Sequence, residues 1–164
     1  MDSIDKFNKL SKAEFISIFG NVFEKTEWIA ERCYESKPFN NLDELVLKMM
    51  KIFENIEKER HLEILNSHPN LAVEKKLTED SKNEQKNASL NQCNDDEFIE
   101  FKKLNEEYKK KFGFPFIIAV KGKNKEEILN SFRQRITNNI NLEFEEAKKQ
   151  VKKIASFRLD EIIK

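Results

Sequence analysis

The chain has 164 residues, of which 37% are charged and 38% hydrophobic, with only 3 glycines and 3 prolines. So few helix-breaking residues in a chain rich in lysine, glutamate and leucine favour a mostly helical protein. The 30 basic and 30 acidic side chains cancel, which excludes a global field that would recruit nucleic acid or an anionic membrane. At this length we expect one domain over residues 1–164.

Eight helices are predicted from capping residues and from apolar side chains at helical spacing. Ser11 begins a capping box, Thr78 caps a helix expected to reach Leu90, and Asn94 opens a long helix that Gly113 stops. In chain order the helices begin at or near Ser11, Trp28, Asn41, Leu62, Thr78, Asn94, Asn124 and Asn141. The predicted fold class is therefore all-α, a single-domain bundle of about eight helices.

Residues 112–122 depart from the helical pattern. They contain two of the three glycines, a proline and then β-branched residues, which predicts a buried extended segment over about 114–120. Without a partner strand, the backbone N–H and C=O groups of this segment need other partners. A bound polar ligand would supply them, and so would side chains and water around a connector that only spans the core.

The compartment is indicated by the absence of membrane and signal patterns and by the cysteines. No run of about 18 apolar residues occurs, and the N-terminus at Met1–Asp5 lacks the pattern of a signal or transit peptide. Cys33 and Cys93 in such a chain predict reduced thiols. We expect a soluble, cytoplasmic protein.

His68-Pro69 ends an apolar, helix-like run. Pro69 has no backbone donor and disfavours a helical residue before it, which places His68 at a helix end. The only other histidine is His61, so acid–base chemistry near neutral pH is assigned to His68. The alternative is a structural histidine stabilised by the C-terminal helix dipole. The spacing around the two histidines does not resemble a zinc site, so no metal is expected.

In two of the predicted helices, polar residues lie on the face that is expected to point into the core. On the helix after Thr78, Ser81, Glu84 and Gln85 share one face with Ala88, and the opposite face looks solvent-exposed. Buried polar groups need partners, which favours a small-molecule site, although a peripheral polar flap fits as well. Arg158 continues the apolar stripe of the last helix, so its guanidinium needs an anion, either a substrate or a carboxylate such as Glu84. The alternative is that the side chain extends to solvent near the chain end.

These segments together resemble the OHCU decarboxylases, which act on 2-oxo-4-hydroxy-4-carboxy-5-ureidoimidazoline. The matching motifs, in chain order, are Phe19-Gly20-Asn21-Val22-Phe23-Glu24, Trp28-Ile29-Ala30, Pro38-Phe39, His68-Pro69-Asn70-Leu71-Ala72, Leu77-Thr78, Ser81, Glu84-Gln85, Ala88-Ser89-Leu90, Phe112-Gly113-Phe114-Pro115-Phe116-Ile117-Ile118-Ala119, Ile154-Ala155 and Arg158-Leu159. Two positions depart from the family pattern, since Asn70 stands where an acidic residue is usual and Ser89 where glycine is usual.

The resemblance implies a cofactor-free, all-helical enzyme of urate degradation that forms a homodimer and releases S-allantoin and carbon dioxide. In it, His68 and Glu84 would be the catalytic residues. The substrate-binding residues would be Pro69, Ser81, Glu84, Gln85, the backbone of Phe116, Ile117, Ile118, Ala119 and Val120, and the cationic anchor Arg158. Two other classes stay open, a non-catalytic helical interaction domain and a histidine phosphotransfer module, although the latter exposes its histidine in mid-helix, which Pro69 disfavours.

Overall fold

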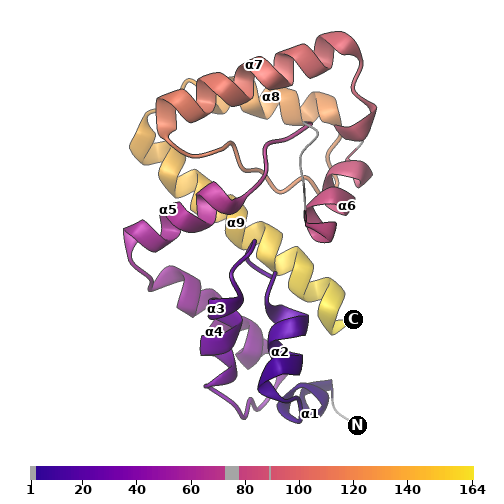
Figure 1. Ribbon diagram of the computed structural model, residues 1–164, viewed down its shortest axis with the longest axis vertical. Coiled ribbons are helices and arrows are strands. Elements are labelled where there is room, and N and C mark those ends of the chain that lie inside the picture. The colour runs from indigo at the N-terminus through magenta and orange to yellow at the C-terminus, as the bar shows by residue number, and fades with distance from the viewer. Residues whose placement is uncertain (1–2, 73–77, 89) are drawn as a thin grey trace. The chain divides into compact units, whose positions relative to one another are not determined.

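The computed structural model describes residues 3–72, 78–88 and 90–164, and within these ranges it consists of helices and connecting segments, with no strand (Figure 1). This confirms the prediction of an all-α protein. The elements are α1 (Ser3–Asn8), α2 (Lys12–Phe19), α3 (Glu27–Tyr34), α4 (Leu42–Glu54), α5 (Lys58–Ser67), α6 (Glu79–Asn87), the 3-10 helix η1 (Leu90–Gln92), α7 (Asp95–Phe112), α8 (Lys125–Arg135) and α9 (Ile140–Ile163).

Five helices begin at the polar caps that the sequence predicts, whereas α1 was not predicted and α5 begins four residues before Leu62. Thr78, Asn94 and Asn124 each accept a hydrogen bond from the backbone N–H three residues later, as do Ser11 and Asn41. Gly113 ends α7 in the left-handed conformation, with φ of 81°, where a side chain would be strained.

The expected cap at Asn141 is wrong, because α9 already begins at Ile140. The side-chain oxygen of Asn139 accepts the N–H of Leu142 at 2.8 Å instead. Asn139 and Asn141 are of the same residue type, which is favoured at helix caps, so the sequence alone does not choose between them. The helix capped by Thr78 also ends earlier than predicted, at Asn87, and Leu90 lies in the separate 3-10 helix.

The chain divides into two compact units. The first comprises Met1–Ile64 and Lys152–Lys164, and the second comprises Leu65–Val151. Helices α5 and α9 therefore contribute residues to both units. The expectation of a single domain stays a prediction.

The core of each unit is built around aromatic rings. In the first unit, the ring of Phe23 stacks on that of Phe53 at 4.8 Å, and Phe19 contacts Phe7 edge-on. Cys33 lies in the same core with no exposed surface, and burial raises the pKa of its thiol to about 12, which keeps it protonated and unreactive at neutral pH. In the second unit, Tyr108 lies edge-on to several phenylalanine rings.

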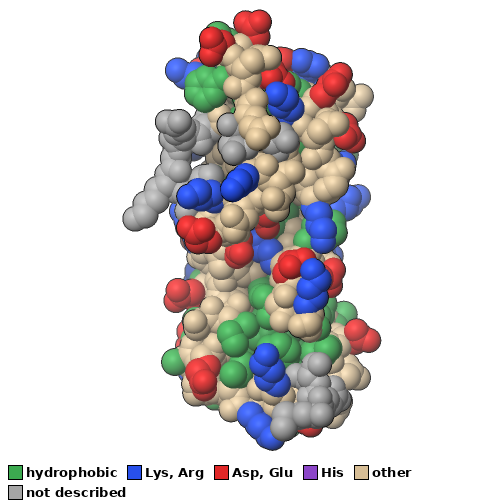
Figure 2. Space-filling model, turned by 90° about the vertical axis from the view of Figure 1, so that its right-hand side faces the viewer, with side chains coloured by type: hydrophobic (Ala, Val, Ile, Leu, Met, Phe, Trp, Pro, Cys, Tyr) green, Lys and Arg blue, Asp and Glu red, His purple; other side chains and the backbone are tan. Residues whose placement is uncertain are grey.

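The surface carries charges of both signs, in agreement with the zero net charge. On the face shown in Figure 2, basic and acidic side chains are interspersed, and hydrophobic side chains gather in the lower part of the view. In the part of the chain that the structure describes, no helix combines the length and the apolar character needed to cross a membrane.

Candidate active site

His68 lies directly after the end of α5, as the sequence predicts. Its backbone N–H donates to the carbonyl of Leu65 at 3.3 Å, and the residue is only 8% exposed. His61, by contrast, has a structural environment in the first unit. Its Nε2 lies 2.7 Å from the carbonyl oxygen of Phe53, and its ring packs edge-on against the Phe53 ring. This environment supports the assignment of acid–base chemistry to His68 rather than to His61.

The turn that follows His68 is held by side chains from two helices. Gln85 of α6 accepts the backbone N–H of Ala72 at 3.1 Å and donates to the carbonyl of Asn70 at 3.3 Å. Asn105 of α7 donates to the carbonyl of Leu71 at 3.0 Å. Ala72 has φ of 57°, an uncommon conformation for a residue with a side chain, which the surrounding hydrogen bonds stabilise. The loop bearing His68 is thus fixed to α6 and α7.

Asn105 was not among the residues singled out in the sequence. The available signal was its position, because it lies four residues after Phe101 and three before Tyr108, on the apolar face of α7. Its side-chain oxygen is buried, and no hydrogen bond to it occurs within the described residues. A polar side chain on such a face needs a partner, and the backbone of residue 71 provides one.

Helix α6 has the orientation that the sequence predicts. Ser81, Gln85 and Ala88 are buried and Glu84 is half-buried. The opposite face is exposed and carries Lys82, Asn83, Lys86 and Asn87. The polar residues proposed to contact substrate therefore share the inner face of one helix. Because both ends of the Gln85 amide already bind backbone groups, Gln85 has a structural role, while its contact with a substrate stays a prediction.

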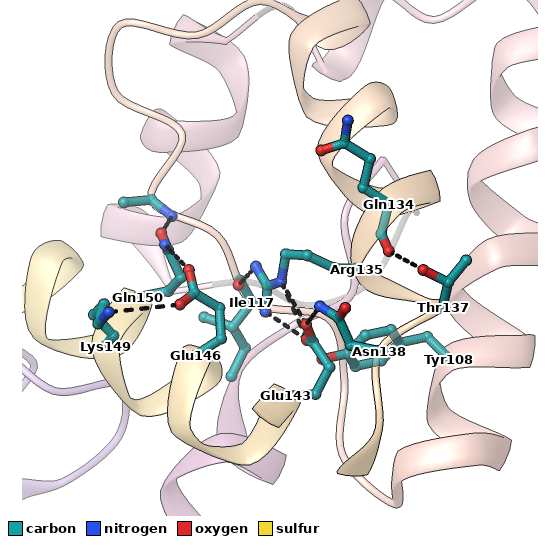
Figure 3. Close-up of polar contacts among 11 residues, drawn as sticks. Tyr108, Ile117, Gln134, Arg135, Thr137, Asn138, Glu143, Glu146, Lys149 and Gln150 are labelled. Carbon is teal, nitrogen blue, oxygen red and sulfur yellow. Dashed lines mark hydrogen bonds and ion pairs between the residues drawn. The ribbon is translucent and has the colours of Figure 1, made fainter. Parts of the chain in front are cut away.

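The segment 115–120 is non-helical and buried between helices of the second unit. The carbonyl of Ile117 accepts Nη1 of Arg135 at 2.7 Å, and the N–H of Ala119 donates to Oε1 of Gln150 at 3.0 Å (Figure 3). Phe116 stacks on Phe132, with ring centroids 3.9 Å apart. Two of the backbone groups that needed partners are thus satisfied by side chains.

A buried ionic network, which no sequence motif indicates, holds this segment. Glu143 has no exposed surface, and its carboxylate lies 2.9 Å from Nη2 of Arg135. The Tyr108 hydroxyl donates to the same carboxylate, and Asn138 donates to it at 3.0 Å. Burial, together with the hydrogen bond to Glu143, raises the pKa of Tyr108 far above its ordinary value, so the phenol stays a donor. Tyr108, Arg135 and Glu143 come from three helices and Asn138 from the segment between α8 and α9, so no local sequence pattern indicates that they meet.

Arg158 belongs to the first unit and has its own partners there. Its Nη1 donates to the carbonyl of Asn21 at 2.8 Å, and its Nη2 lies 3.4 Å from a carboxylate oxygen of Glu24. The arginine side chain is 5% exposed and the Glu24 side chain 0%. The guanidinium therefore has a protein carboxylate as partner, which is Glu24 of the first motif. Its role as a substrate anchor stays a prediction.

The described helices of the second unit hold three features in place: the turn after His68, the buried polar face of α6 and the non-helical segment 115–120. A model of the OHCU decarboxylase family matches residues 8–160. The 2-oxo-4-hydroxy-4-carboxy-5-ureidoimidazoline decarboxylase of Haloferax volcanii is 35% identical over 97% of this chain and 95% of its own length. The chain belongs to the OHCU decarboxylase family.

Other relatives are longer or more distant. A uric acid degradation bifunctional protein of Bacillus sp. is 41% identical over the whole chain, but the chain spans only 33% of that protein's length. Among solved structures, an (S)-allantoin synthase matches the whole chain with a TM-score of 0.80 and 27% identity, over 54% of its own chain. An OHCU decarboxylase crystallised in the presence of (S)-allantoin matches 83% of this chain and 90% of its own, with a TM-score of 0.71 and 26% identity.

Proposed function

We propose that this chain decarboxylates 2-oxo-4-hydroxy-4-carboxy-5-ureidoimidazoline to S-allantoin in urate degradation, without a cofactor. The observation that carries the proposal is the His68 turn, which Gln85 ties to the helix that bears Ser81 and Glu84. A histidine held by two helices beside a polar inner face is suited to proton transfer at a bound small molecule. A phosphotransfer module is disfavoured, because His68 is only 8% exposed and lies beyond the end of α5.

The reaction requires one bond cleavage and a redistribution of protons. The bond from ring carbon 4 to its carboxylate breaks, and the electron pair enters the ring through the adjacent C=N bond while carbon dioxide leaves. The ring nitrogen takes up a proton, the 4-hydroxyl loses its proton to become a carbonyl, and carbon 5 gains a proton on one face. Overall the carboxylate form of the substrate consumes one proton.

The proposed roles follow from these steps. His68 exchanges the proton between the hydroxyl and the ring, and Glu84 orients the imidazole or the hydroxyl. Backbone N–H groups of segment 116–120 bind the substrate's carbonyl oxygens and stabilise the developing negative charge. Arg158 binds an anionic or carbonyl edge. Pro69, Ser81 and Gln85 complete the contacts to the substrate.

The proposal is tested with freshly generated substrate, whose ultraviolet absorbance falls as it decarboxylates. We expect the absorbance to fall faster with the protein than without it, and the allantoin formed to be the S enantiomer by circular dichroism. Decay at the spontaneous rate with racemic allantoin would show that the proposed activity is wrong.

We further propose that the protein is a cytoplasmic homodimer. Large apolar side chains exposed on α4 and α7 are compatible with association, notably Leu47 at 55% and Ile99 at 62%, and the free cysteines suit a reducing compartment. Light scattering coupled to size-exclusion chromatography is expected to give twice the 19.5 kDa mass of the chain. A mass equal to that of one chain at micromolar concentration would contradict the dimer.

A further inference from the structure

The segment 116–120 is held at two successive places by side chains that no motif of the sequence had marked. Arg135 binds the carbonyl of Ile117, and Gln150 binds the N–H of Ala119. These two groups belong to the peptide units on either side of Ile118. The orientation of both peptide groups is therefore determined by hydrogen bonds from side chains of α8 and α9 (Figure 3).

The two bonds also determine where the backbone groups of Ile118 point. In a trans peptide the N–H lies opposite the C=O of the same unit, and Lys37-Pro38 is the cis bond that the described chain contains. The N–H of Ile118 is therefore directed away from Arg135, and its C=O is directed away from Gln150. One residue thus presents a donor and an acceptor side by side.

Within the described part of the chain, neither of these two groups has a hydrogen-bond partner. Ile118 as a residue is 7% exposed, and a peptide group of so buried a residue that lacks a partner is costly, by roughly 1–3 kcal/mol. An adjacent donor and acceptor fit the edge of an amide or urea, which offers a C=O beside an N–H. Ureido and ring 2-oxo groups contain such edges.

We propose that Gln150 and Arg135 are positioning residues, which hold the peptide units around Ile118 so that its N–H and C=O bind a ureide edge of the substrate. This inference rests on the proposed decarboxylase function. Arg135 is kept in place by the buried carboxylate of Glu143, whereas the half-buried Glu146 accepts only the Nε2 of Gln150, at 3.0 Å, and forms no hydrogen bond with the described segment. The rigid scaffold reduces the reorganisation that the developing charge would otherwise require.

Gln150 offers the sharper test, because it makes a single bond to the segment. Gln150→Leu removes the acceptor of Ala119 at similar size, and we expect kcat/KM to fall on the order of 10- to 100-fold, mainly in kcat, since a misplaced donor weakens transition-state binding. Glu146→Ala is the matched control: it removes the outer partner of Gln150 but leaves the bond to Ala119, and we expect activity within about threefold of wild type.

A reciprocal exchange provides the rescue. The double variant Gln150→Glu with Glu146→Gln keeps an acceptor for Ala119 and keeps the hydrogen bond between the two side chains, so kcat should return to within about threefold of wild type. Should Gln150→Leu fail to fold, Gln150→Lys takes its place, because lysine can pair with Glu146 while offering Ala119 no acceptor. It carries the same expectation as the leucine variant.

The outcomes separate this inference from the proposed function. A wild-type protein that does not accelerate the reaction overturns the proposed function, and the inference falls with it. A second outcome overturns the inference alone. In it, the wild type is active, and the folded Gln150→Leu or Gln150→Lys variant has the same kcat and KM as Glu146→Ala. A loss of kcat in the leucine or lysine variant that the reciprocal exchange restores supports it.

Discussion

Replacement of His68 by alanine is expected to lower the catalysed rate of substrate decay by about 10²- to 10⁴-fold, the range that a positioned acid–base group contributes. The fold should survive, because the turn after His68 is held by Gln85 and Asn105 through the backbone of residues 70–72. The measurement is the initial rate of absorbance loss, corrected for the spontaneous reaction.

His61→Gln serves as the control for this experiment. Its side-chain amide can donate to the carbonyl of Phe53, as the Nε2 of His61 can, and we expect a decay rate within about threefold of wild type, since this residue takes no part in proton transfer. An undiminished rate in His68→Ala would show that the proton is transferred by another group, and Glu84 would be the next residue to replace.

Removal of the Glu143 carboxylate is expected to give the largest loss of stability. Glu143→Ala leaves the guanidinium of Arg135 buried without its counter-charge and deprives Tyr108 of its acceptor. Breaking a buried pair from one side costs about 3–5 kcal/mol. Urea denaturation followed by far-ultraviolet circular dichroism measures the change in the free energy of unfolding.

Glu100→Ala provides the comparison for this loss. Glu100 pairs with Arg133 through two contacts, at 2.5 and 2.6 Å, but the arginine side chain is 49% exposed. Loss of this ion pair should therefore lower the free energy of unfolding by only about 0.2–1 kcal/mol. Equal losses in the two variants would contradict the stabilising role of the buried network. Because an apolar pair can replace a buried ion pair, Glu143→Leu combined with Arg135→Met should recover much of the stability lost in Glu143→Ala.

The sequence predicted those features that depend on neighbours along the chain. Thr78, Asn94 and Gly113 mark helix ends through local hydrogen bonding and backbone conformation, and the spacing of Ser81 and Gln85 places them on one buried face. The departure from the helical pattern over residues 112–122 likewise predicted the buried non-helical segment. Each of these inferences needs only the geometry of one turn or one helix.

What the sequence could not predict are the partners brought together by tertiary packing. Arg135 and Glu143 are both ordinary charged residues in their own helices, and Tyr108 completes their network from a third. In the same way, the sequence marked Arg158 as an inward cation but did not identify Glu24 as its carboxylate. A chain with 30 basic and 30 acidic residues offers too many possible pairs for composition to decide which ones form.

The pairing of Glu24 with Arg158 has a consequence for the order in which the protein folds. The two residues are 134 positions apart, and the first unit is completed by Lys152–Lys164. During synthesis from the N-terminus, the carboxylate of Glu24 has no cation from residue 158 until most of α9 has been made. Because closing so long a loop is entropically slow, the second unit, whose residues are contiguous, can assemble before the first.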